Sequence, residues 1–119
     1  MKTSAKLLGT IGEQKSCDYL TEDGYEILEK NYRCKFGEID IIAKKGGLII
    51  FIEVKTRSKN NFCEPEESVN DFKIRHIRNC ANYYIQQKEL GDYEFNFDVI
   101  SIIVKDKTMS LKHFRNCNI

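Results

Sequence analysis

Four charged residues interrupt the most strand-like part of the chain. Glu38 and Asp40 lie in one isoleucine-rich segment, and Glu53 and Lys55 lie in the next. Acids in segments that otherwise supply a hydrophobic core call for a chemical explanation. Carboxylates are ligands for divalent cations, and a nearby lysine can act on a water molecule or on a phosphate.

The turn between the two segments sets which residues face each other. Residues 37–44 and 48–56 have the pattern of two strands, and Gly46-Gly47 between them favours a tight turn because glycine accepts positive φ. If these glycines are the loop, Asp40 lies opposite Glu53, and Glu38 lies opposite Lys55. Opposed residues of an antiparallel pair share a face, with Cβ atoms about 4.5–5.5 Å apart. We therefore expect one charged cluster, with the core on the other face: Ile39, Ile41, Ile50, Ile52 and Val54.

The spacing Asp-x(12)-Glu-x-Lys indicates a metal-dependent phosphodiesterase. Two adjacent carboxylates repel each other, and a divalent cation removes that conflict. Magnesium takes one or two carboxylates together with water and substrate phosphate. Such a cation acidifies a bound water and neutralises phosphodiester charge, and Lys55 is close enough to act on either group. The alternative is a solvent-exposed strand face, since alternating strands often carry Glu and Lys in cross-strand pairs.

The remaining pattern predicts a small α/β domain in the order αβββαββ. Residues 1–119 are expected to form this one domain, a mixed sheet flanked by helices. Ser4 can cap the first helix and Gly24 can end it, while Ser68 and Gly91 are the matching signals for the second helix. The predicted helices are 4–22 and 69–89, and the predicted strands are 25–33, 37–44, 48–56, 94–104 and 109–114.

Composition excludes several classes of protein. Hydrophobic residues make up 41% of the chain, charged residues 31%, and the net charge is +1, as in ordinary globular domains. The five cysteines stand singly, which argues against a zinc site and a disulfide framework. No run approaches the roughly 20 apolar residues of a membrane span, and no signal peptide is visible. We expect a cytoplasmic protein with no membrane partner.

Five short segments, in this order, resemble the PD-(D/E)xK nuclease superfamily, which has the restriction-endonuclease-like fold. More narrowly, the chain is similar to the YraN family, relatives of archaeal Holliday-junction resolvases. No proline precedes Asp40, so the step that gives the superfamily its "PD" is absent. The segments are Gly9–Glu13, Asn31–Arg33, Gly37–Asp40, Phe51–Arg57 and Phe97–Val99.

The resemblance implies a restriction-endonuclease-like αβββαβ core and a role for each site residue. Asp40 and Glu53 would hold Mg²⁺ or Mn²⁺, Lys55 would be the catalytic lysine, and Glu13 on the first helix would join the metal site. The implied activity is an endonuclease on branched or structured DNA. A homodimer would fit, because resolvase-like enzymes generally need two active sites. An alternative is a non-catalytic nucleic-acid-binding or accessory module with a vestigial site.

Two basic residues are candidates for contact with nucleic acid. Arg57 lies two residues after Lys55 on the same predicted strand, and we expect it to bind the phosphate next to the scissile one. Lys73 on the second helix, with Arg75 and Arg78, forms a basic patch that can contact phosphates. A plain solvated helix face is the alternative for these three residues.

Three further residues carry weaker predictions. Glu13 shares a helix face with small and apolar residues, which favours an inward position over a rim ion pair. Asp98 shares a strand face with isoleucines, so it points inward, either near the site or as a buried hydrogen-bonded acid. His113 has no metal-ligand spacing and is expected on the surface.

Overall fold

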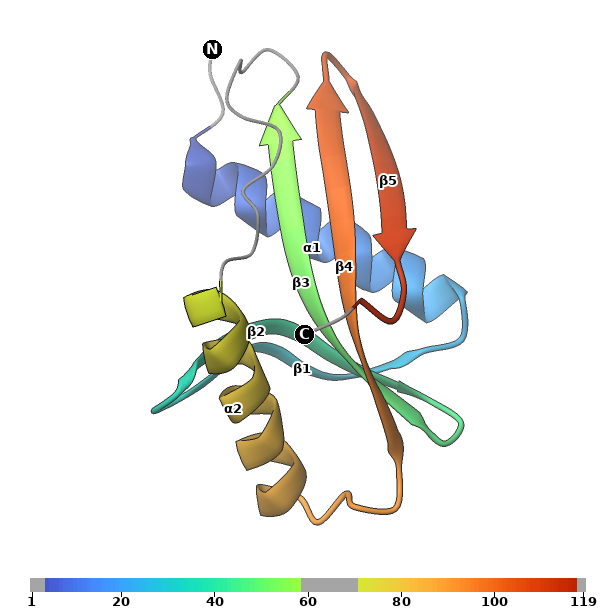
Figure 1. Cartoon of the computed structure of the whole chain (residues 1–119). Coiled ribbons are helices and arrows are strands. Elements are labelled where there is room, and N and C mark those ends of the chain that lie inside the picture. The colour runs from blue at the N-terminus through green and yellow to red at the C-terminus, as the bar shows by residue number, and fades with distance from the viewer. Residues whose placement is uncertain (1–3, 59–70, 118–119) are drawn as a thin grey trace.

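The computed structural model describes residues 4–58 and 71–117 and has the predicted order αβββαββ (Figure 1). Every described element boundary lies within two residues of its predicted position. Neither described helix combines the length and the apolar character that crossing a bilayer requires. The elements are α1 (Ala5–Glu22), β1 (Glu26–Cys34), β2 (Gly37–Lys45), β3 (Leu48–Ser58), α2 (Asp71–Gln87), β4 (Glu94–Lys105) and β5 (Thr108–Phe114).

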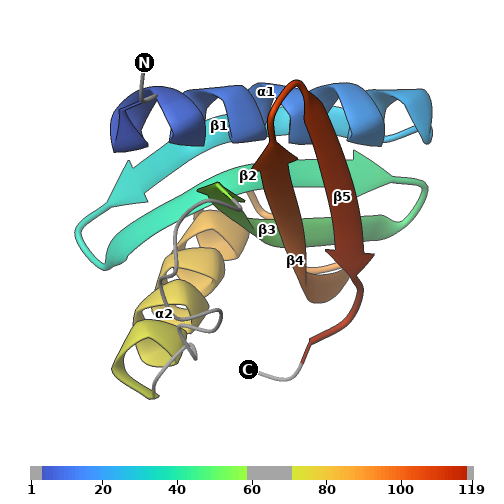
Figure 2. The same cartoon turned by 90° about the horizontal axis from the view of Figure 1, so that it is seen from above.

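The five strands form one mixed sheet in the order β1-β2-β3-β4-β5. β3 and β4 are parallel, and the other neighbours are antiparallel. A parallel pair needs a crossover connection, and α2 lies in the connection between β3 and β4. α1 crosses one face of the sheet and α2 packs on the opposite face (Figures 1 and 2). The predicted α/β class, a mixed sheet flanked by helices, is confirmed.

Each face of the sheet has its own hydrophobic core. Leu20 of α1 packs with Ile50 and Ile52 of β3, whereas Tyr84 of α2 packs with Phe51. Because helices cover both faces here, this half of β3 is apolar at every position, as in buried strands. Alternation then places Glu53 on the α2 face, the face of Phe51.

β2 changes the face it presents at Asp40. Ile41 belongs to the core under α1, but Ile39 belongs to the core under α2. The neighbouring residue of β1, Asn31, has a left-handed φ of 53°, which marks a local irregularity in the β1–β2 pair. The prediction that Ile39 and Ile41 share one face is therefore wrong.

Each helix is followed within two residues by a residue with left-handed φ, as is common at helix C-termini. Ser4 caps α1 by accepting a hydrogen bond from the Leu7 N–H, and Gly24 follows the helix with φ 93°. Both predictions are confirmed. α2 ends before Gly91, because Glu89 adopts the left-handed φ of 54° instead. Ser68 lies outside the described residues.

Candidate active site

β2 and β3 stop pairing just before the predicted charged cluster. The predicted turn is confirmed, since Lys45 pairs with Leu48, and the antiparallel register continues as far as Ile41 with Ile52. One residue further, Asp40 Oδ2 accepts a hydrogen bond from the backbone N–H of Val54 at 2.8 Å. A side chain thus replaces the next strand-to-strand hydrogen bond, and Asp40 occupies the fork between the two strands.

Glu38 does not lie opposite Lys55 in a strand pair, so this part of the predicted register is wrong. Beyond the fork, β2 continues with β1, while β3 continues with β4. Glu38 pairs with Arg33 of β1 instead, and Arg33 Nε donates to Glu38 Oε2 at 3.0 Å. Both side chains are exposed, so the ion pair adds little stability.

The Asp40 carboxyl lies in an environment that disfavours its negative charge. Burial is the largest cause and raises its pKa from the ordinary 3.8 to about 7. The hydrogen bond from Val54 opposes this shift, while the carboxylates of Glu53, Glu13 and Glu38 add to it. At neutral pH the group is divided between its two protonation states, and a cation bound beside it would favour the ionised form.

Glu53 is neutralised from α2. Lys73 Nζ lies 2.6 Å from Glu53 Oε2, and the Glu53 side chain is only 13% exposed. The ion pair ties the beginning of α2 to β3 beside the fork. Lys73 was predicted as a nucleic-acid contact from its charge; sequence reasoning missed that it neutralises a candidate metal ligand, because the two residues are 20 positions apart.

α1 approaches β3 closely at Gly12. A Cβ on Gly12 would lie 1.8 Å from Thr56 Oγ1, so this approach requires glycine. Glu13 follows directly, is half-buried, and contributes to the raised pKa of Asp40. The inward face predicted for Glu13 agrees with the burial of its neighbours on α1: Gly12, Ser16, Cys17 and Leu20.

Lys55 and Arg57 follow Glu53 on β3 at steps of two residues, so all three share the α2 face of the sheet. Both basic side chains are half-buried. Basic groups therefore continue the row that begins with the candidate ligand Glu53. Their catalytic and phosphate-binding roles stay predictions.

The donor set suits a hard divalent cation. Asp40 and Glu53 supply two carboxylates, the number that magnesium commonly takes from a protein when substrate phosphate and water complete its shell. Among the described residues, the Asp40 carboxylate makes one hydrogen bond, which leaves its other oxygen for a ligand. No group of three His, Cys, Asp or Glu side chains in residues 4–58 and 71–117 is assembled for a metal. The place of Glu13 in such a site stays a prediction.

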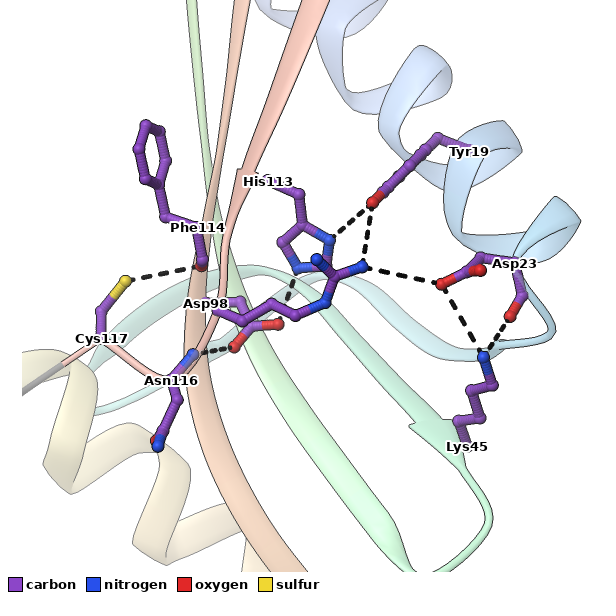
Figure 3. A network of polar contacts seen from close by, with 9 residues as sticks. Tyr19, Asp23, Lys45, Asp98, His113, Phe114, Asn116 and Cys117 are labelled. Atoms are coloured by element: carbon purple, nitrogen blue, oxygen red, sulfur yellow. Dashed lines mark hydrogen bonds and ion pairs between the residues drawn. The ribbon is translucent and has the colours of Figure 1, made fainter.

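Asp98 belongs to a separate polar network near the C-terminal end of α1 (Figure 3). Its carboxylate contacts His113 Nε2 at 2.7 Å and accepts from the Asn116 N–H at 2.9 Å. His113 Nδ1 lies 2.8 Å from the Tyr19 hydroxyl. The buried, hydrogen-bonded acid is therefore confirmed for Asp98, whereas the surface position predicted for His113 is wrong. Alternation with the half-buried Leu111 on β5 was the signal for an inward histidine.

The fold and the comparisons define the family. The arrangement is an αβββαβ core with one more strand at its C-terminal end. The model of "Uncharacterised protein family UPF0102" matches residues 12–102. The chain therefore belongs to the UPF0102, or YraN, family.

Individual relatives match most of the chain. A UPF0102 protein of Clostridium perfringens strain 13 is 51% identical over 102 residues, which cover 86% of this chain and 84% of the relative. A UPF0102 protein of Caldicellulosiruptor saccharolyticus is 40% identical over 111 residues, 92% and 94% of the two chains. One of Dictyoglomus turgidum is 44% identical over 86% of each.

Proposed function

We propose that this protein is a metal-dependent endonuclease that hydrolyses phosphodiester bonds in branched or structured DNA. The observation that carries the proposal is the half-buried Asp40 carboxyl at the β2–β3 fork, with a pKa of about 7, beside Glu53. Membership of the YraN family supports it through the resemblance of that family to resolvases. Asp40 and Glu53, joined by Glu13, would hold Mg²⁺ or Mn²⁺.

The chain prepares these groups before any ligand arrives. When bound, a divalent cation supplies Lewis acidity toward water and phosphate oxygens. The Val54 N–H holds Asp40 in one orientation, which lowers the entropy cost of binding. Lys73 Nζ lies 2.6 Å from Glu53 Oε2 and holds that carboxylate beside the fork. Lys55 would hold the attacking water or the scissile phosphate, and Arg57 the neighbouring phosphate.

Calorimetric titration with Mn²⁺ tests the metal site directly. Wild type is expected to bind Mn²⁺, and the double variant Asp40→Ala, Glu53→Ala is expected to lose that binding. A matched control is Asp92→Ala, Glu94→Ala, which removes two exposed acids at the start of β4. Cleavage of a branched DNA is then compared in the same proteins. Metal-dependent cleavage that survives in Asp40→Ala would contradict the proposal.

A non-catalytic DNA-binding module is the second candidate function. It is favoured by the Lys73–Glu53 ion pair, which already neutralises one candidate ligand, and by the lack of a three-ligand cluster among the described residues. This candidate predicts DNA binding that weakens as salt rises, with no turnover at any divalent metal concentration. Turnover lost in Asp40→Ala would exclude it.

A further inference from the structure

Beyond Glu53, the α2-side face of β3, β4 and β5 carries rows of side chains in register. Residues paired across neighbouring strands point to the same face. The opposite face of the same strands is core, as Ile100 and Ile102 show. The rows are Glu53–Val99–Phe114, Lys55–Ser101–Lys112 and Arg57–Ile103–Ser110.

No described helix lies over the outer part of this face. α2 packs against β1, β2 and the first halves of β3 and β4, as far as Phe51 and Val99, and α1 lies on the other side of the sheet (Figures 1 and 2). Two large apolar side chains are consequently open to solvent, Ile103 at 41% and Phe114 at 48% exposed. An exposed aromatic ring in the same row as a candidate metal ligand is the unusual feature.

The charge of the face is one-sided. Lys55, Arg57 and Lys112 lie in the rows, and Lys105 lies two residues beyond Ile103 on the same side of β4. In these rows the single acid is Glu53, at the end beside the fork. The chain as a whole is nearly neutral, with a net charge of +1, so the basic character belongs to this face. A polyanion is the partner that such a face complements.

The spacing of the groups suits a nucleic-acid strand. Neighbouring strands lie about 4.8 Å apart, so Lys112 is about 10 Å from Lys55, and Phe114 is about 10 Å from Glu53. Charges along one DNA strand recur about every 3.4 Å of helix axis, so these rows span about three nucleotides. Bases of a single strand stack on exposed aromatic rings irrespective of sequence.

We propose that this face binds a single-stranded segment of nucleic acid leading away from the candidate site, an inference that rests on the proposed function. Phe114 stacks on a base, and Lys112 and Lys105 contact phosphates. A second copy of the chain fits the face less well. In a two-fold dimer the same surface meets itself, so lysines would face lysines.

The test is binding of a fluorescent oligothymidylate, followed by anisotropy in EDTA so that cleavage is absent. Phe114→Ala is expected to weaken binding about fivefold or more. Lys112→Ala is expected to reduce the salt dependence of the logarithm of affinity by about 0.7. Met109→Ala is the control for the aromatic change, because Met109 is exposed on the opposite face of β5. Lys15→Ala, on the exposed side of α1, is the control for the charge.

Every outcome bears on the inference. Wild-type affinity and salt dependence in both variants would overturn it, as would absence of oligothymidylate binding by wild type. If Phe114→Ala loses its circular dichroism signal, the exposed Lys112→Ala and Lys112→Glu variants decide the matter. Weaker self-association of Phe114→Ala with unchanged oligothymidylate affinity would assign the face to a second copy and overturn the proposal.

The same proteins separate this inference from the proposed function. If wild type cleaves branched DNA and Lys112→Ala binds oligothymidylate normally, the proposed binding face is rejected and the proposed nuclease activity is kept. If oligothymidylate binding depends on Phe114 and Lys112 but no Mn²⁺ concentration gives cleavage, the proposed nuclease activity is rejected and the proposed binding face is kept.

Discussion

The Asp40 carboxylate accepts the Val54 amide hydrogen at the position where β2 and β3 stop pairing. One side chain therefore accepts the last hydrogen bond between these two strands and also presents a half-buried carboxyl to the candidate site. The two roles can be separated, because asparagine keeps an oxygen for the Val54 N–H but carries no charge.

Asp40 should make stability depend on pH. Its pKa is about 7 in the folded chain, against the ordinary 3.8, so the folded state binds more protons between these values. The free energy of unfolding should therefore fall as pH rises from about 4 to 7, by at most about 4 kcal/mol from this group. Urea unfolding in EDTA at several pH values measures it. Asp40→Asn should lose this part of the pH dependence, and an identical profile in wild type and variant would contradict the assignment.

Removing Lys73 should strengthen metal binding. A cation near Glu53 must displace or tolerate the ammonium group 2.6 Å from its carboxylate. Lys73→Ala should raise Mn²⁺ affinity about fivefold, the equivalent of an ion pair worth about 1 kcal/mol. Calorimetry measures it, with Lys88→Ala as an exposed control near the other end of α2. Equal or weaker Mn²⁺ affinity in Lys73→Ala would show that Glu53 is not a ligand.

Two glycines of α1 should respond oppositely to alanine. Gly12→Ala places a methyl group against Thr56 and should cost about 1–3 kcal/mol of stability. Gly9→Ala meets nothing within 4 Å and should add about 0.5–1 kcal/mol through helix propensity. Thermal or urea unfolding of both variants compares them. Stabilisation by both substitutions would mean that α1 does not contact β3 at Gly12.

His113→Leu should lower the free energy of unfolding and yet leave metal binding at the candidate site unchanged. The side chains of His113 and Asp98 are 3% and 2% exposed, and loss of the imidazole leaves the buried Asp98 carboxylate with the Asn116 N–H but without its His113 partner. A loss of about 3 kcal/mol in the free energy of unfolding is expected. Mn²⁺ binding should be unchanged below the unfolding temperature. The exposed His76→Leu is the control, and a loss of Mn²⁺ binding in folded His113→Leu would connect the two networks.

The fold was predictable because local signals agree with one another. Glycine pairs, capping residues and apolar alternation placed the described elements within two residues, and the Gly46-Gly47 turn determined the register as far as Ile41. Periodicity could not show that β2 would stay with β1 and leave β3 at Asp40, since that depends on which neighbour each strand keeps. The partners of Lys73 and His113 were hidden for the same reason: both contacts join residues far apart in the sequence or in different elements.

Because of the fork, β3 is the strand that joins the β1–β2 pair to β4. It pairs with β4 along its whole length, from Leu48 to Ser58, but with β2 only as far as Ile52, so the β1–β2 pair and the β3–β4 pair separate beyond the fork. Asp40 lies on β2, and Glu53 is the first residue of β3 beyond the part that pairs with β2. A ligand that binds both carboxylates would therefore hold the two strands together at the fork. The melting temperature of the protein would then rise with the concentration of that ligand.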